Sequence, residues 1–126
     1  MTGLDRGRRA HLALGRRGEA AVRNLYRRRG YEILAADWRC RYGELDIVAL
    51  DGGVLVFAEV KTLRREAAYR PADNLSRRQL RRDLRAAAEF REKFASDRFP
   101  WRFELVEVVY RSRFSVSVRR TRLSRA

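Results

Sequence analysis

Two strand-like segments joined by a glycine turn constrain the fold of this chain more than any other feature of its sequence. Residues 43–50, GELDIVAL, and residues 54–63, VLVFAEVKTL, are rich in Val, Leu, Ile and Phe and flank Asp51-Gly52-Gly53. Short apolar runs around an Asp-Gly pair are typical of a β-hairpin. The sequence therefore predicts an antiparallel pair of strands near the middle of the chain.

The length of the turn decides which side chains of this hairpin face each other. A loop of two residues, or of four, places Asp46 opposite Glu59 and Glu44 opposite Lys61. Because side chains alternate along a strand, these four then lie on one face of the sheet. A three-residue loop shifts the register by one and separates them.

Three carboxylates and one lysine on one sheet face are unfavourable unless a cation joins them. Two anions about 5 Å apart repel by roughly 3 kcal/mol at an effective dielectric constant near 20. Carboxylate oxygens suit Mg²⁺ or Mn²⁺, which can activate water and neutralise charge on a phosphate. The alternative is that the acids are solvent-facing strand residues paired with arginines.

The charge of the chain indicates a polyanionic partner. The 126 residues carry a net charge of +14, and of the 30 cations only Lys61 and Lys93 are not arginine. Residues 31–63 have six acids and three cations, so an acidic centre lies within a basic frame. A metal-dependent enzyme acting on nucleic acid needs both carboxylates for the metal and cations for the strands.

Several classes of protein are excluded or disfavoured. The single cysteine, Cys40, cannot form an intrachain disulfide or a cysteine-based zinc site. No apolar run approaches the roughly 20 residues of a membrane helix, and residues 1–15 lack the apolar block of a signal peptide. We expect a soluble cytoplasmic protein with no membrane partner.

The remaining elements complete an α/β pattern with the order α-β-β-β-α-β and an extra C-terminal strand. Helical spacing covers residues 12–29, with Gly30 as a stop, and a strand follows over 31–38. Ser76 and Gln79 fit a capping box for a helix reaching residue 94. Its apolar stripe is expected to be Leu80, Leu84, Ala87, Ala88 and Phe94. Strands are expected over 102–110 and around 114–118.

These elements predict one domain over residues 12–119, preceded by a basic, mobile arm over 1–11 and followed by a basic tail over 120–126. The second helix carries a broad basic face for phosphates. The expected nucleic-acid-binding residues are Arg64, Arg65, Arg77, Arg78, Arg81, Arg82 and Arg85. Further arginines are expected to extend this surface: Arg111, Arg113, Arg119, Arg120, Arg122 and Arg125.

Asp46 followed by Glu59-Val60-Lys61 resembles the motif of the PD-(D/E)XK nuclease superfamily, whose fold is restriction-endonuclease-like. The chain also resembles, more closely, the YraN family of bacterial proteins, which is placed near Holliday-junction-resolvase-like nucleases. The matching segments are residues 15–21, 30–34, 41–49 and 56–62, with a looser match through the second helix and residues 102–106.

The resemblance implies a role for each matching residue. Asp46 and Glu59 would be metal ligands, the Val60 carbonyl an extra ligand, and Lys61 the catalytic lysine. Glu19 matches a helix glutamate that completes the metal site in resolvase-like members. Glu44 is either a group behind the ligands or a partner of Lys61.

The chain departs from the family pattern at a few positions outside the Asp46, Glu59 and Lys61 set. Asp37 stands where Asn is usual, and Glu104 stands where Asp is usual. Resolvase-like nucleases act as dimers, so the resemblance also implies a homodimer, which no feature of the sequence itself demonstrates.

The predicted function is hydrolysis of phosphodiester bonds in DNA, preferred over RNA, with Mg²⁺ or Mn²⁺ as cofactor and structured or branched DNA as the expected substrate. The first alternative is a non-catalytic nucleic-acid-binding or adaptor protein that retains the fold. The second is a basic RNA- or ribosome-associated protein, whose binding would not depend on Asp46 or Glu59.

Overall fold

The secondary-structure elements follow the predicted mixed α/β order. The computed structural model describes residues 3–64, 75–94, 98–112 and 115–125. Within these ranges no helix is both long and apolar enough to cross a membrane. The elements are α1 (Gly3–Arg28), β1 (Glu32–Cys40), β2 (Gly43–Asp51), β3 (Val54–Arg64), α2 (Arg77–Lys93), β4 (Trp101–Tyr110) and β5 (Val116–Arg125).

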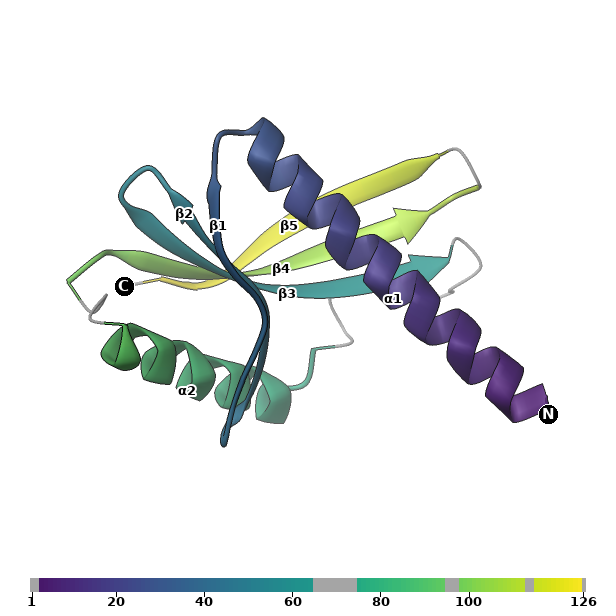
Figure 1. The fold of residues 1–126 in the computed structure, drawn as a ribbon, viewed down its shortest axis with the longest axis horizontal. Helices are drawn as coiled ribbons and strands as arrows, with labels where there is room; N and C mark the ends of the chain where they lie inside the picture. The colour runs from purple at the N-terminus through teal and green to yellow at the C-terminus, as the bar shows by residue number, and fades with distance from the viewer. Residues whose placement is uncertain (1–2, 65–74, 95–97, 113–114, 126) are drawn as a thin grey trace.

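The strands form one five-stranded sheet in the order β1-β2-β3-β4-β5, with α1 and α2 on opposite faces (Figure 1). Only β3 and β4 run parallel, and α2 lies on the connection between them. Val22 and Tyr26 of α1 pack in one core cluster with Ala58. Phe90 of α2 packs in the other with Phe57, so β3 lies between both helices.

Local signals in the sequence fix where the helices end and begin. Gly30 has a φ of +83°, and the Tyr31 N–H donates to the Tyr26 carbonyl at 2.9 Å. These are features of a Schellman cap, in which a glycine ends a helix. At α2, Ser76 is the N-cap and its Oγ accepts from the Gln79 N–H at 3.0 Å.

The segments predicted as an arm and a tail contain helix and strand among the described residues. Helix α1 begins at Gly3, and no proline in the segment predicted as an arm interrupts its helical hydrogen bonding. Residues 120–125, assigned to the tail, belong to β5 and pair with β4 as far as Arg102↔Arg125. This pairing satisfies the backbone of the C-terminal segment.

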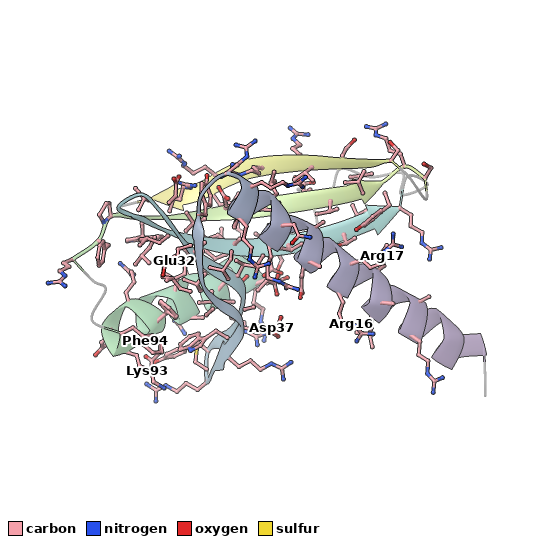
Figure 2. All side chains as sticks on the ribbon, turned by 45° about the horizontal axis from the view of Figure 1, so that its top comes forward. Arg16, Arg17, Glu32, Asp37, Lys93 and Phe94 are labelled. Atoms are coloured by element: carbon pink, nitrogen blue, oxygen red, sulfur yellow. The ribbon has the colours of Figure 1, made fainter. Side chains whose placement is uncertain are left out.

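The predicted apolar stripe of α2 is rotated from the observed one. The buried residues are Asp83, Ala86, Ala87 and Phe90, whereas Phe94 is 52% exposed at the end of the helix (Figure 2). This face packs on β2 and includes one acidic residue, Asp83, whose side chain therefore points toward the sheet.

Candidate metal centre and nucleic-acid interface

The β2–β3 hairpin has the register predicted for a two-residue loop. Paired positions run from Asp51↔Val54 at the turn to Ile47↔Ala58. Gly52 has a φ of +60°, which a glycine adopts without strain. The hairpin therefore places the ends of the two strands that carry Asp46 and Glu59 in the same region of the sheet.

The acidic residues do not continue this ladder as predicted. Beyond the paired positions the Asp46 carboxylate takes the place of a backbone acceptor, because the Val60 N–H donates to Asp46 Oδ2 at 2.8 Å. The paired positions end before Asp46 and Glu59, but the carboxyl groups of these two residues are hydrogen-bonded to each other. Glu44 and Lys61 are likewise not among the paired positions. Glu44 Oε1 lies 3.6 Å from Arg39 Nε instead.

The backbone of β1 is irregular at Asp37, although the register shift of the β1–β2 pair lies between Ile33 and Ala35. The two strands pair on either side of Asp37 and Asp46, at 36↔47 and 38↔45. Asp37 has a φ of +51°, in the left-handed region that Asp and Asn tolerate better than most residues. Leu45 and Val48 share one core cluster although they are three residues apart, so the alternation of side chains is interrupted at Asp46.

Helix α1 adds a third acid to these two. Carboxylate oxygens of Glu19, Asp37 and Asp46 lie within 4.8 Å of one another, and Asp37 is seen beside the bent strands in Figure 2. The close approach of α1 depends on Gly18, because an added Cβ would lie 1.8 Å from Thr62 Oγ1 on β3. The predicted contribution of the first helix to the site is thus present in the geometry.

Glu59 is held on the other face of the sheet. Its side chain is 9% exposed, and its Oε1 lies 3.4 Å from Lys61 Nζ. The same oxygen accepts from Gln79 Nε2 at 2.8 Å. Gln79 therefore fulfils only half of the predicted capping box: its backbone binds Ser76, but its side chain crosses to the sheet.

The pKa values of these acids are raised. Burial, together with the negative charges of Asp46 and Asp83, raises the pKa of Glu59 to about 9. Burial and the charge of Asp46 raise the pKa of Glu19 to about 7 and that of Asp83 to about 6. Burial also raises the pKa of Asp46, against the hydrogen bond from the Val60 N–H.

This donor set fits a hard divalent cation. All of the side-chain ligands offered are carboxylate oxygens, which Mg²⁺ and Mn²⁺ prefer. Burial is the main reason that the pKa values of Glu19, Asp46 and Glu59 are raised, and the charges of neighbouring carboxylates add to it. A cation would remove this repulsion. That the Val60 carbonyl is a ligand stays a prediction.

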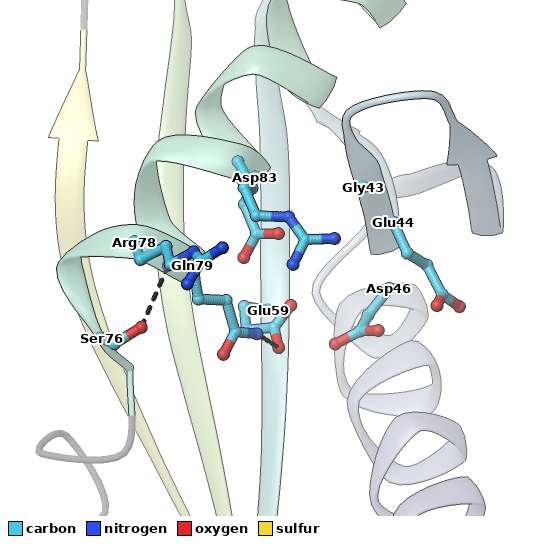
Figure 3. Close-up of a pocket in the computed structure, with 9 residues that line it drawn as sticks. Gly43, Glu44, Asp46, Glu59, Ser76, Arg78, Gln79 and Asp83 are labelled. Atoms are coloured by element: carbon cyan, nitrogen blue, oxygen red, sulfur yellow. Dashed lines mark hydrogen bonds between the residues drawn. The ribbon is translucent and has the colours of Figure 1, made fainter.

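A pocket of about 440 Å³ opens between β2, β3 and α2 beside these acids (Figure 3). Glu44, Asp46 and Glu59 line it from the sheet. Gln79 and Asp83 line it from α2, together with Gly43, Ser76, Arg78 and Arg82. The pocket is therefore acidic at its base and carries arginines at its rim.

The arginines of α2 form the basic face that their spacing predicted. Arg78, Arg81, Arg82 and Arg85, here called the arginine face, are exposed and together line a hollow of about 330 Å³. Arg78 and Arg82 also line the acidic pocket, so this hollow and the acidic pocket share two of their lining residues. Arg64 and Arg77 are exposed, and Arg65 lies outside the described residues.

A second group of buried charges lies beside Tyr26, near the C-terminal end of α1, and is called here the Glu104 network. Glu104 is 3% exposed and lies 3.3 Å from Arg102 Nε and 3.1 Å from Arg120 Nη2. Tyr26 Oη also donates to Glu104, and both arginines donate to Tyr31 Oη. Arg120 thus balances a buried acid, so the prediction that it extends the basic surface is wrong.

Sequence reasoning missed three residues of the site. Asp37 was noticed only as a departure from the Asn of similar proteins. Its backbone has a positive φ, which both Asp and Asn adopt more readily than most residues. Asp83 shares a helix face with Ala86 and Phe90, at spacings that indicate an inward acid. Gln79 was assigned to capping alone.

Comparisons with known proteins agree with the resemblance stated from the motifs. Residues 18–108 match the uncharacterised protein family UPF0102, which is the YraN family. A UPF0102 protein of Ruegeria pomeroyi is 43% identical over 105 residues, covering 82% of this chain and 83% of its own. Another, of Symbiobacterium thermophilum, is 40% identical over 95 residues, covering 75% of this chain and 80% of its own.

Proposed function

This chain belongs to the uncharacterised protein family UPF0102, and we propose that it is a metal-dependent nuclease that hydrolyses phosphodiester bonds in DNA. The observation that carries the proposal is the convergence of three elements on one acidic site. Glu19 comes from α1, Asp46 from β2, and Glu59 with Lys61 from β3, next to the arginine face.

Glu19, Asp46 and Glu59 would hold Mg²⁺ or Mn²⁺, with Asp37 as a further oxygen donor. When bound, such a cation supplies Lewis acidity that activates water and neutralises charge on a phosphate. Lys61 is fixed by its 3.4 Å contact with Glu59, and its side chain is 28% exposed. An ammonium group held there orients the attacking water and stabilises charge that develops on the phosphate.

The arginine face would hold the DNA backbone. Its guanidinium groups lie on exposed turns of α2, and two of them, Arg78 and Arg82, border the acidic pocket. A phosphate bound by these two arginines lies beside Glu59 and Asp46, so binding and chemistry are adjacent. A preference for branched DNA and a homodimer both stay predictions from the resemblance.

The test is cleavage of labelled four-way-junction, flap, single-stranded and linear duplex DNA in Mg²⁺, Mn²⁺ or EDTA. The wild-type protein is compared with Asp46→Asn and Lys61→Ala, and with Glu92→Gln as a control on the exposed side of α2. We expect metal-dependent cleavage by the wild type and the control, and at least a hundredfold loss in both site variants with DNA binding retained.

Two outcomes would contradict the proposal. The first is cleavage that survives both substitutions, which would indicate a contaminating nuclease. The second is DNA binding by all four proteins without cleavage of any substrate, which would favour the non-catalytic nucleic-acid-binding protein.

A further inference from the structure

The turn between β1 and β2 carries an aromatic side chain to which the proposed chemistry assigns no role. Tyr42 is half-buried and directly precedes Gly43, the first residue of β2. Trp38 on β1, by contrast, packs edge-on against Phe90 in the core, with the ring centres 5.3 Å apart. Tyr42 belongs to neither core cluster of the described residues, so core packing does not explain an aromatic ring at this turn.

The Tyr42 ring is fixed in place by two arginines. The guanidinium carbon of Arg41 lies 4.8 Å from the ring centre, and Arg41 Nη2 donates to Tyr42 Oη at 2.8 Å. From α2, Arg82 Nε donates to the Tyr42 carbonyl at 3.3 Å. Arg82 belongs to the arginine face and lines the acidic pocket with Gly43 (Figure 3). The ring therefore lies beside the proposed path of the DNA, and a ring fixed in advance loses little entropy when a ligand stacks on it.

Tyr42 also lines a hollow of about 310 Å³ beside α2, called here the Tyr42 hollow. This volume is at the lower end for small-molecule sites, which suits a single flat ring. Arg85 of the arginine face lines one end of the hollow, and Ala88 and Glu89 follow along the helix. Glu92 lines the far end, because seven helical residues separate it from Arg85 by about 10 Å.

The charges in the hollow decide which part of a nucleotide it suits. Arg85 attracts a phosphate to its own end, whereas Glu89 repels phosphates from the interior. A nucleobase is uncharged, its face stacks on aromatic rings, and its amino groups donate to carboxylates. A strand on the arginine face can therefore keep its phosphates near Arg85 and turn a base into the hollow, onto Tyr42.

We infer that Tyr42 and the Tyr42 hollow bind one unpaired nucleobase of a strand that lies on the arginine face. A base inside a duplex is covered on both faces by its neighbours, so it cannot stack on a protein ring unless it leaves the duplex. The site therefore favours single strands, flaps and overhangs over a fully paired duplex or a fully paired four-way junction. The inference deepens the proposed function and rests on its DNA binding, but it depends on neither a metal nor cleavage.

DNA binding by the full chain in EDTA tests this inference, because the proposed cleavage needs a metal. Fluorescence anisotropy compares labelled single-stranded DNA with a blunt duplex of the same length. A 2-aminopurine flanked by thymines in the single strand reports stacking, because an aromatic ring quenches its fluorescence. Tyr42→Leu removes the ring and keeps an apolar side chain, whereas Tyr42→Phe keeps the ring and is the matched control.

We expect Tyr42→Leu to weaken single-strand binding at least fivefold, the effect of losing one stacked base, and to change duplex binding less than twofold. Tyr42→Phe should bind both DNAs within twofold of the wild type. The wild type and Tyr42→Phe should quench 2-aminopurine, and Tyr42→Leu should not. Circular dichroism melts establish that each variant is folded.

Unchanged single-strand binding by folded Tyr42→Leu would overturn the inference, as would quenching that persists in this variant or an equal loss for single strand and duplex. If the wild type nevertheless cleaves DNA in Mg²⁺ or Mn²⁺, the proposed function stands without this site. If the Tyr42 variants behave as expected and no DNA is cleaved, the inference stands for a nucleic-acid-binding protein and the proposed nuclease activity fails.

Discussion

Two groups of acidic residues lie beside α1, about two helical turns apart at Glu19 and Tyr26, and they differ in what neutralises them. In the Glu104 network, Arg102 and Arg120 contact Glu104, and Tyr26 donates a hydrogen bond to it. In the acidic site, four carboxylates line one pocket (Glu44, Asp46, Glu59 and Asp83), and a buried oxygen of Asp83 has no hydrogen-bond partner among the described residues. The first group is paired with arginines of its own chain, whereas the second is the site that we propose binds a cation.

The difference also separates stability from function. A buried charge that its own chain pairs contributes to the fold, and removing one partner leaves the others uncompensated. A cluster of like charges opposes folding until a ligand arrives, which is typical of binding and catalytic sites. The same helix, α1, serves both through Tyr26 and Glu19.

The largest expected effect distinguishes the two groups directly. Glu104→Gln should lower the free energy of unfolding by about 3 kcal/mol, because partly buried Arg120 loses its counter-charge and buried Arg102 keeps only Asp51. Asp83→Asn should cost nothing or stabilise the protein, because it removes a charge from a repulsive cluster. Urea unfolding in EDTA at pH 8 measures both. Equal losses in the two variants would remove the distinction.

A somewhat smaller effect is expected where α1 approaches β3. Gly18→Ala should destabilise the protein by about 1–3 kcal/mol, since the new methyl group overlaps Thr62 and must push the helix outward. Glu19 would move with it, so Mn²⁺ binding should weaken as well. Gly15→Ala is the matched control, because open space surrounds Gly15 and a helical alanine stabilises by about 0.5–1 kcal/mol. Similar losses in both variants would contradict this account.

Much of the fold follows from local signals in the sequence. The turn at Gly52 sets the hairpin register, Gly30 ends α1 and Ser76 begins α2. Each depends on neighbouring residues alone. The last strand is longer than predicted, because β5 is stabilised by pairing with β4, which composition does not reveal.

The site was less predictable for a different reason. Asp46 and Glu59 were found from their strands, but the strand irregularity that turns Asp37 toward Glu19 arises only when β1 pairs with β2. Asp83 becomes part of the pocket only once α2 packs on β2. Residues that join a site through tertiary packing carry a weak signal in one sequence.

The dependence of stability on pH should report the unneutralised charge. Glu59 has an ordinary pKa of 4.5 and a pKa of about 9 in the folded protein, so the folded state binds more protons between these values. Stability without metal should therefore fall as the pH rises from 5 to 8.

The expected fall is at most about 1.4 kcal/mol for each pH unit between these two pKa values. Asp46→Asn should reduce it, because the charge of Asp46 raises the pKa of Glu59, and saturating Mn²⁺ should reduce it too. Urea unfolding at pH 5, 6, 7 and 8 measures the slope, with Glu92→Gln as the control. If neither Asp46→Asn nor Mn²⁺ changes the slope of unfolding free energy against pH, the groups that titrate lie outside the acidic site.

The smallest expected effect concerns the arginines beside each group. Arg81→Gln on the arginine face should weaken DNA binding a few-fold and reduce the slope of log K against log salt by about 0.9, the value for one lost phosphate contact. Arg122→Gln is the matched control, because Arg122 is exposed but lines the hollow beside Glu104 instead. Fluorescence anisotropy from 50 to 300 mM salt measures both slopes. If Arg122→Gln lowers the slope as much as Arg81→Gln, DNA contacts both ends of the molecule, and the arginine face is not a dedicated path to the acidic site.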